Sequence, residues 1–343
     1  MAECGIVINL HCFEYGRGEP PELNKFCKSV IYYKRRTPIR SLLSRLPYIV
    51  SSRANSALLR NLLKDDCPIL LEGVHCTYFL SSNDLKNRKI AVRLHNVEFE
   101  YYEELARSAN NILKKIYFSV ESKLLKTYEK SLSNRAMFLA VNEKDKTTYI
   151  KKFKAPNVKF LPVFLPFYKV SSEKGNGTFC LYHGNLSVAE NEKAVLWILN
   201  KIFDTLTIPF VIAGKNPSAH LQKIMHRNNT VCLVANPSQS EMDDLIQKAH
   251  VHILPSFNKT GIKIKLLNAL FHGRFVIAND AAVEGTHLAP LCNIANTPQD
   301  YKKILPTLFN ESFTENEIAN RKGILGSIYN NDVNAQQLMQ WLY

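Results

Sequence analysis

Short apolar segments alternate with longer amphipathic segments along most of this chain, which predicts strands and helices in turn. The alternation is most regular in the second half of the chain. There the predicted strands cover 178–183, 209–213, 230–234, 251–255 and 275–278, and the predicted helices cover 190–203, 218–227, 239–249 and 263–272. Strands that alternate with helices in this way predict a parallel sheet with helices on both faces.

The first half has the same alternation with longer polar interruptions. Predicted strands cover 5–10, 68–73, 90–95, 137–141 and 158–162, helical periodicity covers 39–64 with an interruption at Pro47, and a helix-favouring stretch runs from Asn96 to about Leu132. Between the halves, Pro162, Pro166 and the polar stretch 171–177 form the clearest linker. We therefore expect an α/β protein of two doubly wound domains, with the boundary at residues 168 and 169.

The composition is that of a folded globular protein. The 343 residues are 46% hydrophobic and 22% charged, which suits two domains of ordinary size. No stretch approaches the roughly 20 apolar residues that span a bilayer, and residues 1–4 do not begin a signal peptide, so we expect a cytoplasmic protein. The eight cysteines lack CxxC spacing and several lie in apolar runs, among them Cys180 and Cys232. This pattern predicts buried, reduced thiols and no metal site.

The net charge of +14 is concentrated in the first half of the chain. Residues 1–170 contain 29 Lys and Arg against 16 Asp and Glu, whereas residues 171–343 contain 15 against 14. A basic half predicts an anionic partner, with a merely solvated basic surface as the alternative. No aromatic platform or zinc spacing accompanies the basic run 34–36, so we expect no nucleic-acid binding. The lysines of 151–154 and of the long helical stretch suit a peripheral contact with anionic lipid, and the latter are Lys114, Lys115, Lys123, Lys126 and Lys130.

The segment 251–280 has the strongest pattern, VHILPSFNKTGIKIKLLNALFHGRFVIAND. A predicted strand ends at Pro255, a polar loop with Gly261 follows, and a helix then runs to Gly273. A glycine loop at a helix N-terminus presents backbone N–H groups and the positive end of the helix dipole to an anion. Lys263 and Lys265 add positive charge at the same end. A diphosphate is the expected ligand.

Two more glycine loops follow the first two predicted strands of this domain. One contains Gly184 and Asn185, and the other contains Gly214 and Lys215. Glycine lets the backbone approach a ligand closely, and α/β ligand sites lie at the carboxyl ends of strands. We therefore predict that Lys215 and Lys265 contact phosphate, with solvated lysines as the alternative.

The segment 251–280 resembles the donor-binding signature of the retaining glycosyltransferase family 4, which has the GT-B fold. That signature has one glutamate before its glycine loop and a second eight residues later, and the two positions fall at Thr260 and Asn268 here. The resemblance implies two Rossmann-like domains that face a central cleft, with 1–168 binding the acceptor and 169–326 binding the nucleotide sugar. It also implies that a C-terminal helix, about 327–343, returns to the first domain. The implied donor-binding residues are Gly184, Asn185, Gly214, Lys215, Thr260, Gly261, Ile262, Lys265 and Asn268.

The first domain has its own candidate residues at predicted strand ends. In the resembling family a histidine faces the reacting sugar, and His95 in the run Arg-Leu-His-Asn-Val-Glu matches it, although a structural histidine is the alternative. Glu72 and His75 end the preceding strand and either contact the acceptor or have a structural role. Asn96 is a further candidate for acceptor binding, and so is Arg17 in the first glycine loop.

These residues and the resemblance to family 4 together imply a retaining, metal-independent glycosyltransferase with His95, Lys215 and Lys265 as the catalytic residues. It would move a sugar from a nucleotide diphosphate sugar to a glycan or lipid-linked acceptor in cell-surface polysaccharide biosynthesis, with no cofactor. Positive charge suffices for the departing diphosphate, and the chain lacks an Asp-x-Asp triplet. Two alternatives stay open: a catalytically silent nucleotide-binding subunit, which the replacement of both family glutamates favours, and a nucleotide-sugar 2-epimerase. The expected location is the cytoplasm, at the inner face of the plasma membrane.

Overall fold

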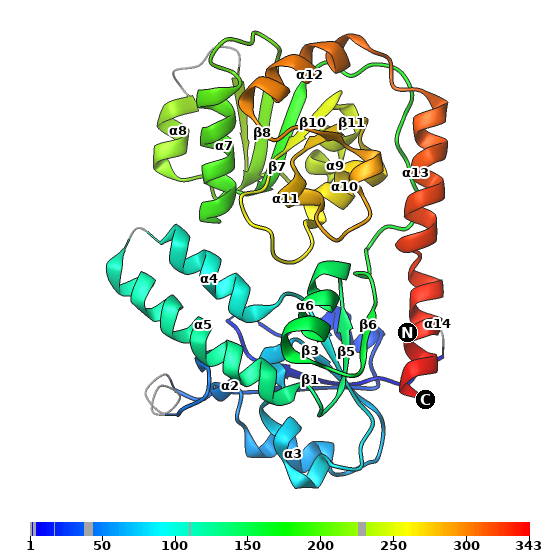
Figure 1. Ribbon diagram of the computed structural model, residues 1–343. Coiled ribbons are helices and arrows are strands. Elements are labelled where there is room, and N and C mark those ends of the chain that lie inside the picture. Colours follow the sequence, from blue (N-terminus) through cyan, green and yellow to red (C-terminus); the bar gives the residue numbers. More distant parts are fainter. Residues whose placement is uncertain (1, 3–4, 17, 38–43, 110, 226–230) are drawn as a thin grey trace. The chain divides into compact units, whose positions relative to one another are not determined.

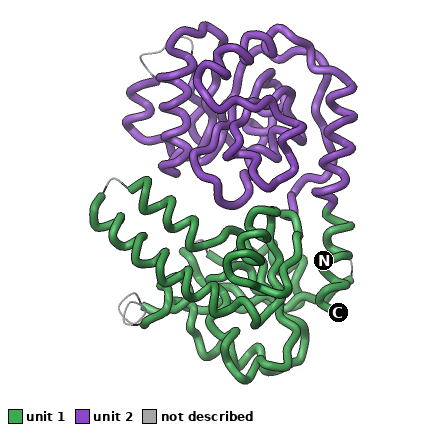
Figure 2. Tube along the Cα trace, in the orientation of Figure 1, with its two compact units in different colours: residues 1–163, 331–343 green, residues 164–330 purple. Residues whose placement is uncertain are grey.

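The structure is a computed structural model that describes residues 2, 5–16, 18–37, 44–109, 111–225 and 231–343. It divides into two compact units, which are coloured in Figure 2. Unit 1 contains Met1–Val163 and Asn331–Tyr343, and unit 2 contains Phe164–Asn330. The division falls inside the Pro-rich stretch that the sequence indicates as a linker.

Unit 2 contains a six-stranded parallel sheet in the order β12-β11-β10-β7-β8-β9. The strands are β7 (Cys180–Asn185), β8 (Phe210–Lys215), β9 (Val231–Ala235), β10 (Val251–Leu254), β11 (Phe275–Ala278) and β12 (Asn293–Ile294). From β7 the chain adds strands outward on one side, and from β10 it adds them on the other, so the strand order reverses between β7 and β10. This is the strand order of a Rossmann nucleotide-binding domain.

Helices cover both faces of this sheet (Figure 1). They are α7 (Ala189–Lys201), α8 (Ala219–Met225), α9 (Gln239–Lys248), α10 (Ile264–His272), α11 (Asp280–Val283), α12 (Pro298–Asn310) and α13 (Glu315–Ile328). Neighbouring residues of a strand point to opposite faces. Leu181 packs with Ile246 of α9, whereas the hydroxyl of Tyr182 reaches Asn191 of α7 at 3.1 Å.

The α10 helix forms because apolar residues recur at helical spacing on its buried side: Leu266, Leu267, Ala269, Leu270 and Phe271. The helix ends at Gly273, where a Cβ atom would lie 2.0 Å from Nε2 of the buried His252. Glycine is therefore required at this position for packing.

The described part of unit 1 contains two separate parallel sheets, whereas that of unit 2 contains one. The first pairs β1 (Asn9–Phe13) with β2 (Ser29–Tyr33), and the second has the order β3-β4-β5-β6. The second sheet consists of β3 (Ile69–Glu72), β4 (Ile90–Leu94), β5 (Met137–Ala140) and β6 (Val158–Phe160). The strand predicted over 5–10 begins late, because its partner β2 begins at Ser29, which is in register with Asn9.

Among the described residues of unit 1, the helices are α2 (Tyr48–Ser51), α3 (Ser56–Leu62), α4 (Glu98–Ser108), α5 (Ile112–Leu132), α6 (Glu143–Phe153) and α14 (Asn331–Leu342). Short 3₁₀ helices cover Pro21–Lys25, Val74–Cys76, Tyr78–Ser81, Asn83–Leu85 and, in unit 2, Ala289–Leu291. Of the predicted helix 39–64, positions 39–43 lie outside the described residues. The rest forms α2 and α3, because Pro47 starts one helix and the side chain of Asn55 caps the next.

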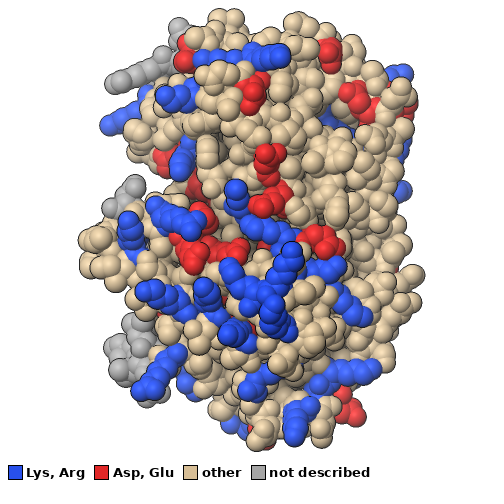
Figure 3. Space-filling view, in the orientation of Figure 1, with Lys and Arg blue, Asp and Glu red and all other residues tan. Residues whose placement is uncertain are grey.

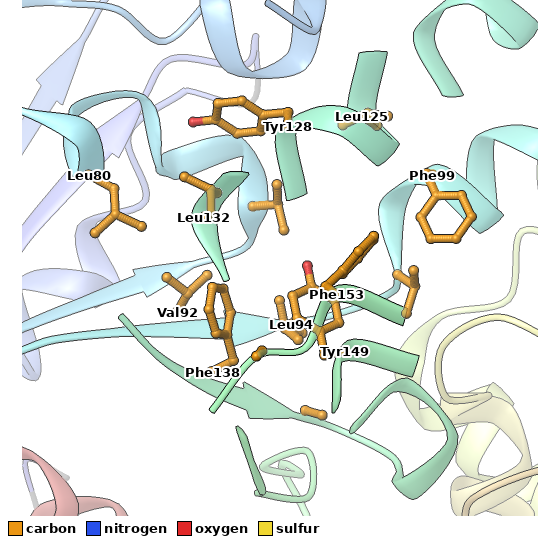
Figure 4. Packing of buried hydrophobic residues seen from close by; sticks show 14 of the residues in the cluster. Leu80, Val92, Leu94, Phe99, Leu125, Tyr128, Leu132, Phe138, Tyr149 and Phe153 are labelled. Carbon is orange, nitrogen blue, oxygen red and sulfur yellow. The ribbon is translucent and has the colours of Figure 1, made fainter. Parts of the chain in front are cut away.

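The main core of unit 1 lies between the second sheet and helices α5 and α6 (Figure 4). Val92 and Leu94 of β4 meet Leu125 and Leu132 of α5 in this cluster, together with Tyr149 of α6. The C-terminal α14 covers a second cluster, in which Leu338 and Leu342 are buried with Ala91, Leu139 and Leu161. The chain end thus completes the fold of the unit in which the chain begins.

The described cysteines are all free thiols, but they are not all buried. Cys180 lies in the central strand β7 and is buried, whereas Cys232 and Cys67 are exposed. The prediction of burial is wrong for Cys232 because β9 is the edge strand of its sheet, and alternate residues of an edge strand face solvent.

Candidate active site

The reversal of strand order in unit 2 places the three glycine loops at one end of the sheet. Ligands of open α/β sheets bind outside the carboxyl ends of the strands at such a reversal. Gly184 and Gly214 are paired in register, as are Asn185 and Lys215, so the first two loops are neighbours. The third loop follows β10, the strand on the other side of β7.

Close packing requires the glycine of the second loop, whereas the backbone conformation, with a φ of 156°, favours the glycine of the first. A Cβ atom at Gly214 would lie 1.9 Å from the carbonyl oxygen of Gly184. A Cβ atom at Gly184 would lie 3.4 Å from Nδ2 of Asn191 and 3.8 Å from Cδ of Lys265. Lys265 therefore lies beside the end of β7.

Lys265 is held at the beginning of α10 by two hydrogen bonds. Its Nζ donates to the Tyr182 hydroxyl at 2.9 Å and to Oδ1 of Asn191 at 2.9 Å. Burial lowers the pKa of this ammonium group to about 8, the negative charge of Glu190 opposes that change, and the positive charge of Lys263 adds to it. An anion bound beside this half-buried ammonium group would stabilise its charged form, and the N-terminus of the helix would attract the same anion.

Asn191 connects three parts of this site. Its side chain donates to the carbonyl oxygen of Asn185 at 2.9 Å and accepts from Lys265 and from the Tyr182 hydroxyl. The first glycine loop, the central strand and α10 are therefore joined through one amide. The sequence analysis missed this residue, because an asparagine near a helix start has the ordinary role of a cap.

Glu190 is a second residue that the sequence analysis missed. The hydroxyl of Ser256, just after β10, donates to Oε1 of Glu190 at 3.0 Å. The carboxylate also interacts electrostatically with Lys265. A half-buried acidic side chain from α7 is thus placed at the loop in which the resembling family has a glutamate. The sequence feature that could have indicated this role is the position of Glu190, directly before Asn191 in the helix that follows the Gly184 loop.

The loop after β10 is tied together by its own side chains. Oδ1 of Asn258 accepts from the backbone N–H of Thr260 at 2.7 Å and from its hydroxyl at 2.8 Å, and Nζ of Lys263 donates to the carbonyl oxygen of Thr260 at 2.7 Å. Thr260 is only 5% exposed. Its hydroxyl therefore organises the loop, while Gly261 takes the left-handed conformation that turns the chain into α10.

The remaining predicted donor residues lie around this loop system. Lys215 is exposed at the end of β8. Oδ1 of Asn185 accepts from both the backbone N–H and the hydroxyl of Ser187, at 3.1 and 2.8 Å. Ile262 and Asn268 are half-buried, before and within α10. Asn185 and Lys215 are the last residues of β7 and β8, and Ile262 belongs to the loop after β10, so these three lie at the carboxyl end of the unit 2 sheet.

The predicted residues of unit 1 gather at the carboxyl ends of β3 and β4. Nε2 of His95 lies 3.0 Å from Oε2 of Glu72, and both side chains are about half exposed. The ring of His75 covers Gly73, where a Cβ atom would lie 2.4 Å from Cε1 of the ring. Burial lowers the pKa of His75 to about 4, with help from the charge of Arg53, so this imidazole is neutral at pH 7. Asn96 follows His95 directly, and Arg17 lies outside the described residues.

Glu98 is a further acidic group next to this cluster. Burial raises its pKa to about 7, and the charges of His95 and Arg53 oppose the rise. The backbone N–H groups of Glu98 and Phe99 donate to the buried carboxylate of Glu129 at 3.1 and 3.0 Å. Glu129 therefore caps the start of α4 and fixes the segment that contains His95 and Glu98.

Two other features of the described chain bear on the type of site. The described residues contain no group of three or more His, Cys, Asp or Glu side chains able to hold a metal ion. Within the same residues, no helix has the length and apolar character needed to cross a membrane.

Sequence comparison places unit 2 near a known family. Residues 177–304 match the family described as "Glycosyl transferases group 1". A Klebsiella pneumoniae protein described as "Uncharacterized 44.6 kDa protein in cps region" is 30% identical over 281 residues, which cover 77% of this chain and 71% of that protein.

Solved structures resemble the whole chain in fold. A UDP-forming α,α-trehalose-phosphate synthase from Burkholderia xenovorans, in complex with glucose-6-phosphate, has a TM-score of 0.62 at 11% identity and covers 85% of this chain and 77% of its own. Anabaena HepE, in complex with UDP and glucose, has a TM-score of 0.61 at 12% identity and covers 93% and 87%. TarM has a TM-score of 0.59 at 12% identity and covers 83% of this chain, which spans only 57% of TarM. These likenesses confirm the GT-B fold with its two Rossmann-like domains.

Proposed function

This chain belongs to the group 1 glycosyltransferases, and from that premise we propose that it transfers a sugar from a nucleotide diphosphate sugar to a glycan or lipid-linked acceptor. The observation that supports this proposal most is the position of Lys265 at the N-terminus of α10, beside Gly184. A diphosphate bound at this end of the sheet would meet backbone N–H groups and at least one ammonium group.

The chemistry needs stabilisation of negative charge on the departing diphosphate. In the proposed reaction the bond between the anomeric carbon and the diphosphate oxygen breaks, a hydroxyl oxygen of the acceptor bonds to that carbon, and the hydroxyl proton passes to the departing diphosphate. Lys265, Lys215 and the start of α10 would stabilise the diphosphate without a metal ion. Retention of configuration and metal independence are proposed from the resemblance to family 4.

Glu190 supplies the carboxylate that position 260 lacks in this proposal. Its Oε1 already accepts a hydrogen bond from Ser256 of the loop after β10. The other oxygen atom can accept from a hydroxyl group of the donor sugar, which is the role of the glutamate in the resembling family. Thr260, whose hydroxyl bonds to Asn258, then shapes the loop and does not contact the sugar.

For the acceptor and the cellular location we propose a general class and not a specific molecule. The description of the Klebsiella pneumoniae relative names a cps region, which supports a role in cell-surface polysaccharide biosynthesis. We propose that His95, Glu72, His75 and Asn96 contact the acceptor or the reacting sugar. The enzyme would act in the cytoplasm at the inner face of the plasma membrane, where a lipid-linked acceptor is accessible.

Calorimetric titration with a panel of nucleoside diphosphates, followed by turnover assays with the matching sugar nucleotides, tests this function. We expect UDP, the nucleotide in the HepE complex, to bind and its sugar nucleotide to be consumed only with an acceptor present. Conversion of the sugar nucleotide without acceptor would indicate the 2-epimerase. Binding without any turnover would indicate the silent subunit. Retained transfer in both the K215A and the K265A variant would contradict the assigned site.

A further inference from the structure

The first turns of α5 expose a set of apolar side chains on one side of the helix. Ile112, Leu113, Ile116, Tyr117 and Val120 are 66%, 73%, 55%, 36% and 51% exposed. At about 100° per residue, these five side chains fall within an arc of about 140° around the helix axis. Single exposed apolar residues are normal, but a continuous group on one element indicates an interaction surface.

The five exposed apolar residues belong to a helix with a well-defined start. Oδ1 of Asn111 accepts from the backbone N–H groups of Leu113 and Lys114 at 2.9 and 3.2 Å, so the helix has a capped start at Ile112. The opposite side of α5 packs within unit 1, where the rings of Phe118 and Tyr102 lie 5.9 Å apart, edge to face. The exposed side is therefore not the one that the fold of unit 1 uses.

The charged residues of α5 differ in exposure according to their sign. Its two acidic residues, Glu121 and Glu129, are 3% and 0% exposed and accept hydrogen bonds inside unit 1. Its exposed charged residues are all lysines, namely Lys114, Lys115, Lys123, Lys126 and Lys130. Figure 3 shows Lys and Arg side chains gathered on the face of unit 1 where α5 lies. Within the described chain, Lys114, Lys115 and Lys123 have no ion-pair partner.

We propose that this apolar and basic side of α5 docks on an anionic lipid bilayer. The five apolar side chains would enter the boundary between headgroups and acyl chains, and the lysines would contact lipid phosphates. Apolar insertion distinguishes this surface from a nucleic-acid site, and the absence of exposed acidic groups on α5 suits a negatively charged partner. The inference rests on the proposed function only for its biological setting, since nothing in it depends on the donor site.

Vesicle flotation of the full chain tests the proposal. We expect binding to vesicles of phosphatidylglycerol and phosphatidylcholine, weaker binding at higher salt, and little binding to phosphatidylcholine alone. The double variant L113S/I116S should lower the partition coefficient about tenfold or more, because two inserted side chains are lost. K114E/K123E should lower it on anionic vesicles only. V7S, at a residue that is 68% exposed outside α5, is the matched control and should bind like wild type.

Calorimetric titration with UDP keeps this proposal separate from the proposed function. The α5 variants should bind UDP as the wild type does, which also shows that they are folded. Equal partition of L113S/I116S and wild type, or equal binding of wild type to neutral and anionic vesicles, would overturn the proposal. So would a wild-type dimer in solution that L113S/I116S converts to a monomer, because a second copy would then be the partner of this surface.

Discussion

The Nζ atom of Lys265 lies 2.9 Å from the Oδ1 atom of Asn191, which joins the start of α10 to the start of α7. The same asparagine donates to the carbonyl oxygen of Asn185. The lysine that we propose to contact the diphosphate is thereby held in position before the ligand binds, which would reduce the entropy lost on binding.

Removal of this contact should weaken nucleotide binding. In the N191A variant we expect UDP affinity to fall by about 10- to 100-fold, because a hydrogen bond to a charged group contributes roughly 1.5–3 kcal/mol. Calorimetry with UDP gives the change in affinity. N200A replaces an exposed asparagine of the same helix and should leave affinity unchanged. Equal affinities of N191A and wild type would remove Asn191 from the site.

The lowered pKa of Lys265 predicts that nucleotide affinity depends on pH. Its pKa is about 8 without ligand, and a bound diphosphate would stabilise the ammonium form and raise the pKa toward or beyond the ordinary 10.5. Between these two pKa values UDP binding takes up a proton, so affinity should fall by up to about tenfold for each pH unit above 8. Below pH 8 the lysine is already charged, and this source of pH dependence disappears.

Calorimetry between pH 7 and 10, in buffers of different ionisation enthalpy, measures both the affinity and the proton uptake. The K265R variant is the control, because its guanidinium stays charged over this range and should abolish the proton uptake. An affinity of wild type that stays constant from pH 8 to 10 would show that Lys265 does not contact the phosphates.

The proposed role of Glu190 predicts a difference between nucleotide binding and sugar transfer. The E190Q variant keeps a side chain of the same shape but lacks the negative charge near Lys265. We expect UDP affinity to stay equal or to increase slightly, since a negative charge next to the diphosphate site is removed, while kcat with the sugar nucleotide falls about 10- to 100-fold. Transfer assays at saturating donor measure the loss.

E192Q is the matched control, because Glu192 is on the same helix but bonds to Ser218, away from the loop after β10. It should retain full transfer activity. A loss of UDP affinity in E190Q with unchanged kcat would place Glu190 in nucleotide binding and contradict its role at the sugar.

Much of this site could be predicted from sequence because glycine loops and strand ends are local patterns. Gly184, Gly214 and Lys265 follow or adjoin predicted strands, and their gathering at one end of the sheet follows from the parallel topology. Glu190 and Asn191 could not be predicted in the same way. Their role depends on the distance from α7 to Ser256 and to Lys265, and those contacts join segments far apart in the chain.

For the fold, too, local elements could be predicted from the sequence, whereas contacts between distant segments could not. Regular alternation in the second half gave the strands and helices of unit 2, and the GT-B fold is confirmed. The separate β1-β2 sheet of unit 1 was not predicted, because apolar periodicity indicates that a strand exists but does not identify the strand that pairs with it.

The contact of α14 with unit 1 predicts a measurable contribution to stability. Leu338 is completely buried against Ala91, Leu139 and Leu161, so the L338A variant should lower the free energy of unfolding by roughly 2–5 kcal/mol. The V333A variant, at a residue of α14 that is 56% exposed, should change it by less than about 0.5 kcal/mol. Urea unfolding of both variants measures the difference, and hydrogen exchange of the α14 amides shows where it arises. If L338A and V333A unfold at the same urea concentration as wild type, α14 does not hold the N-terminal unit together.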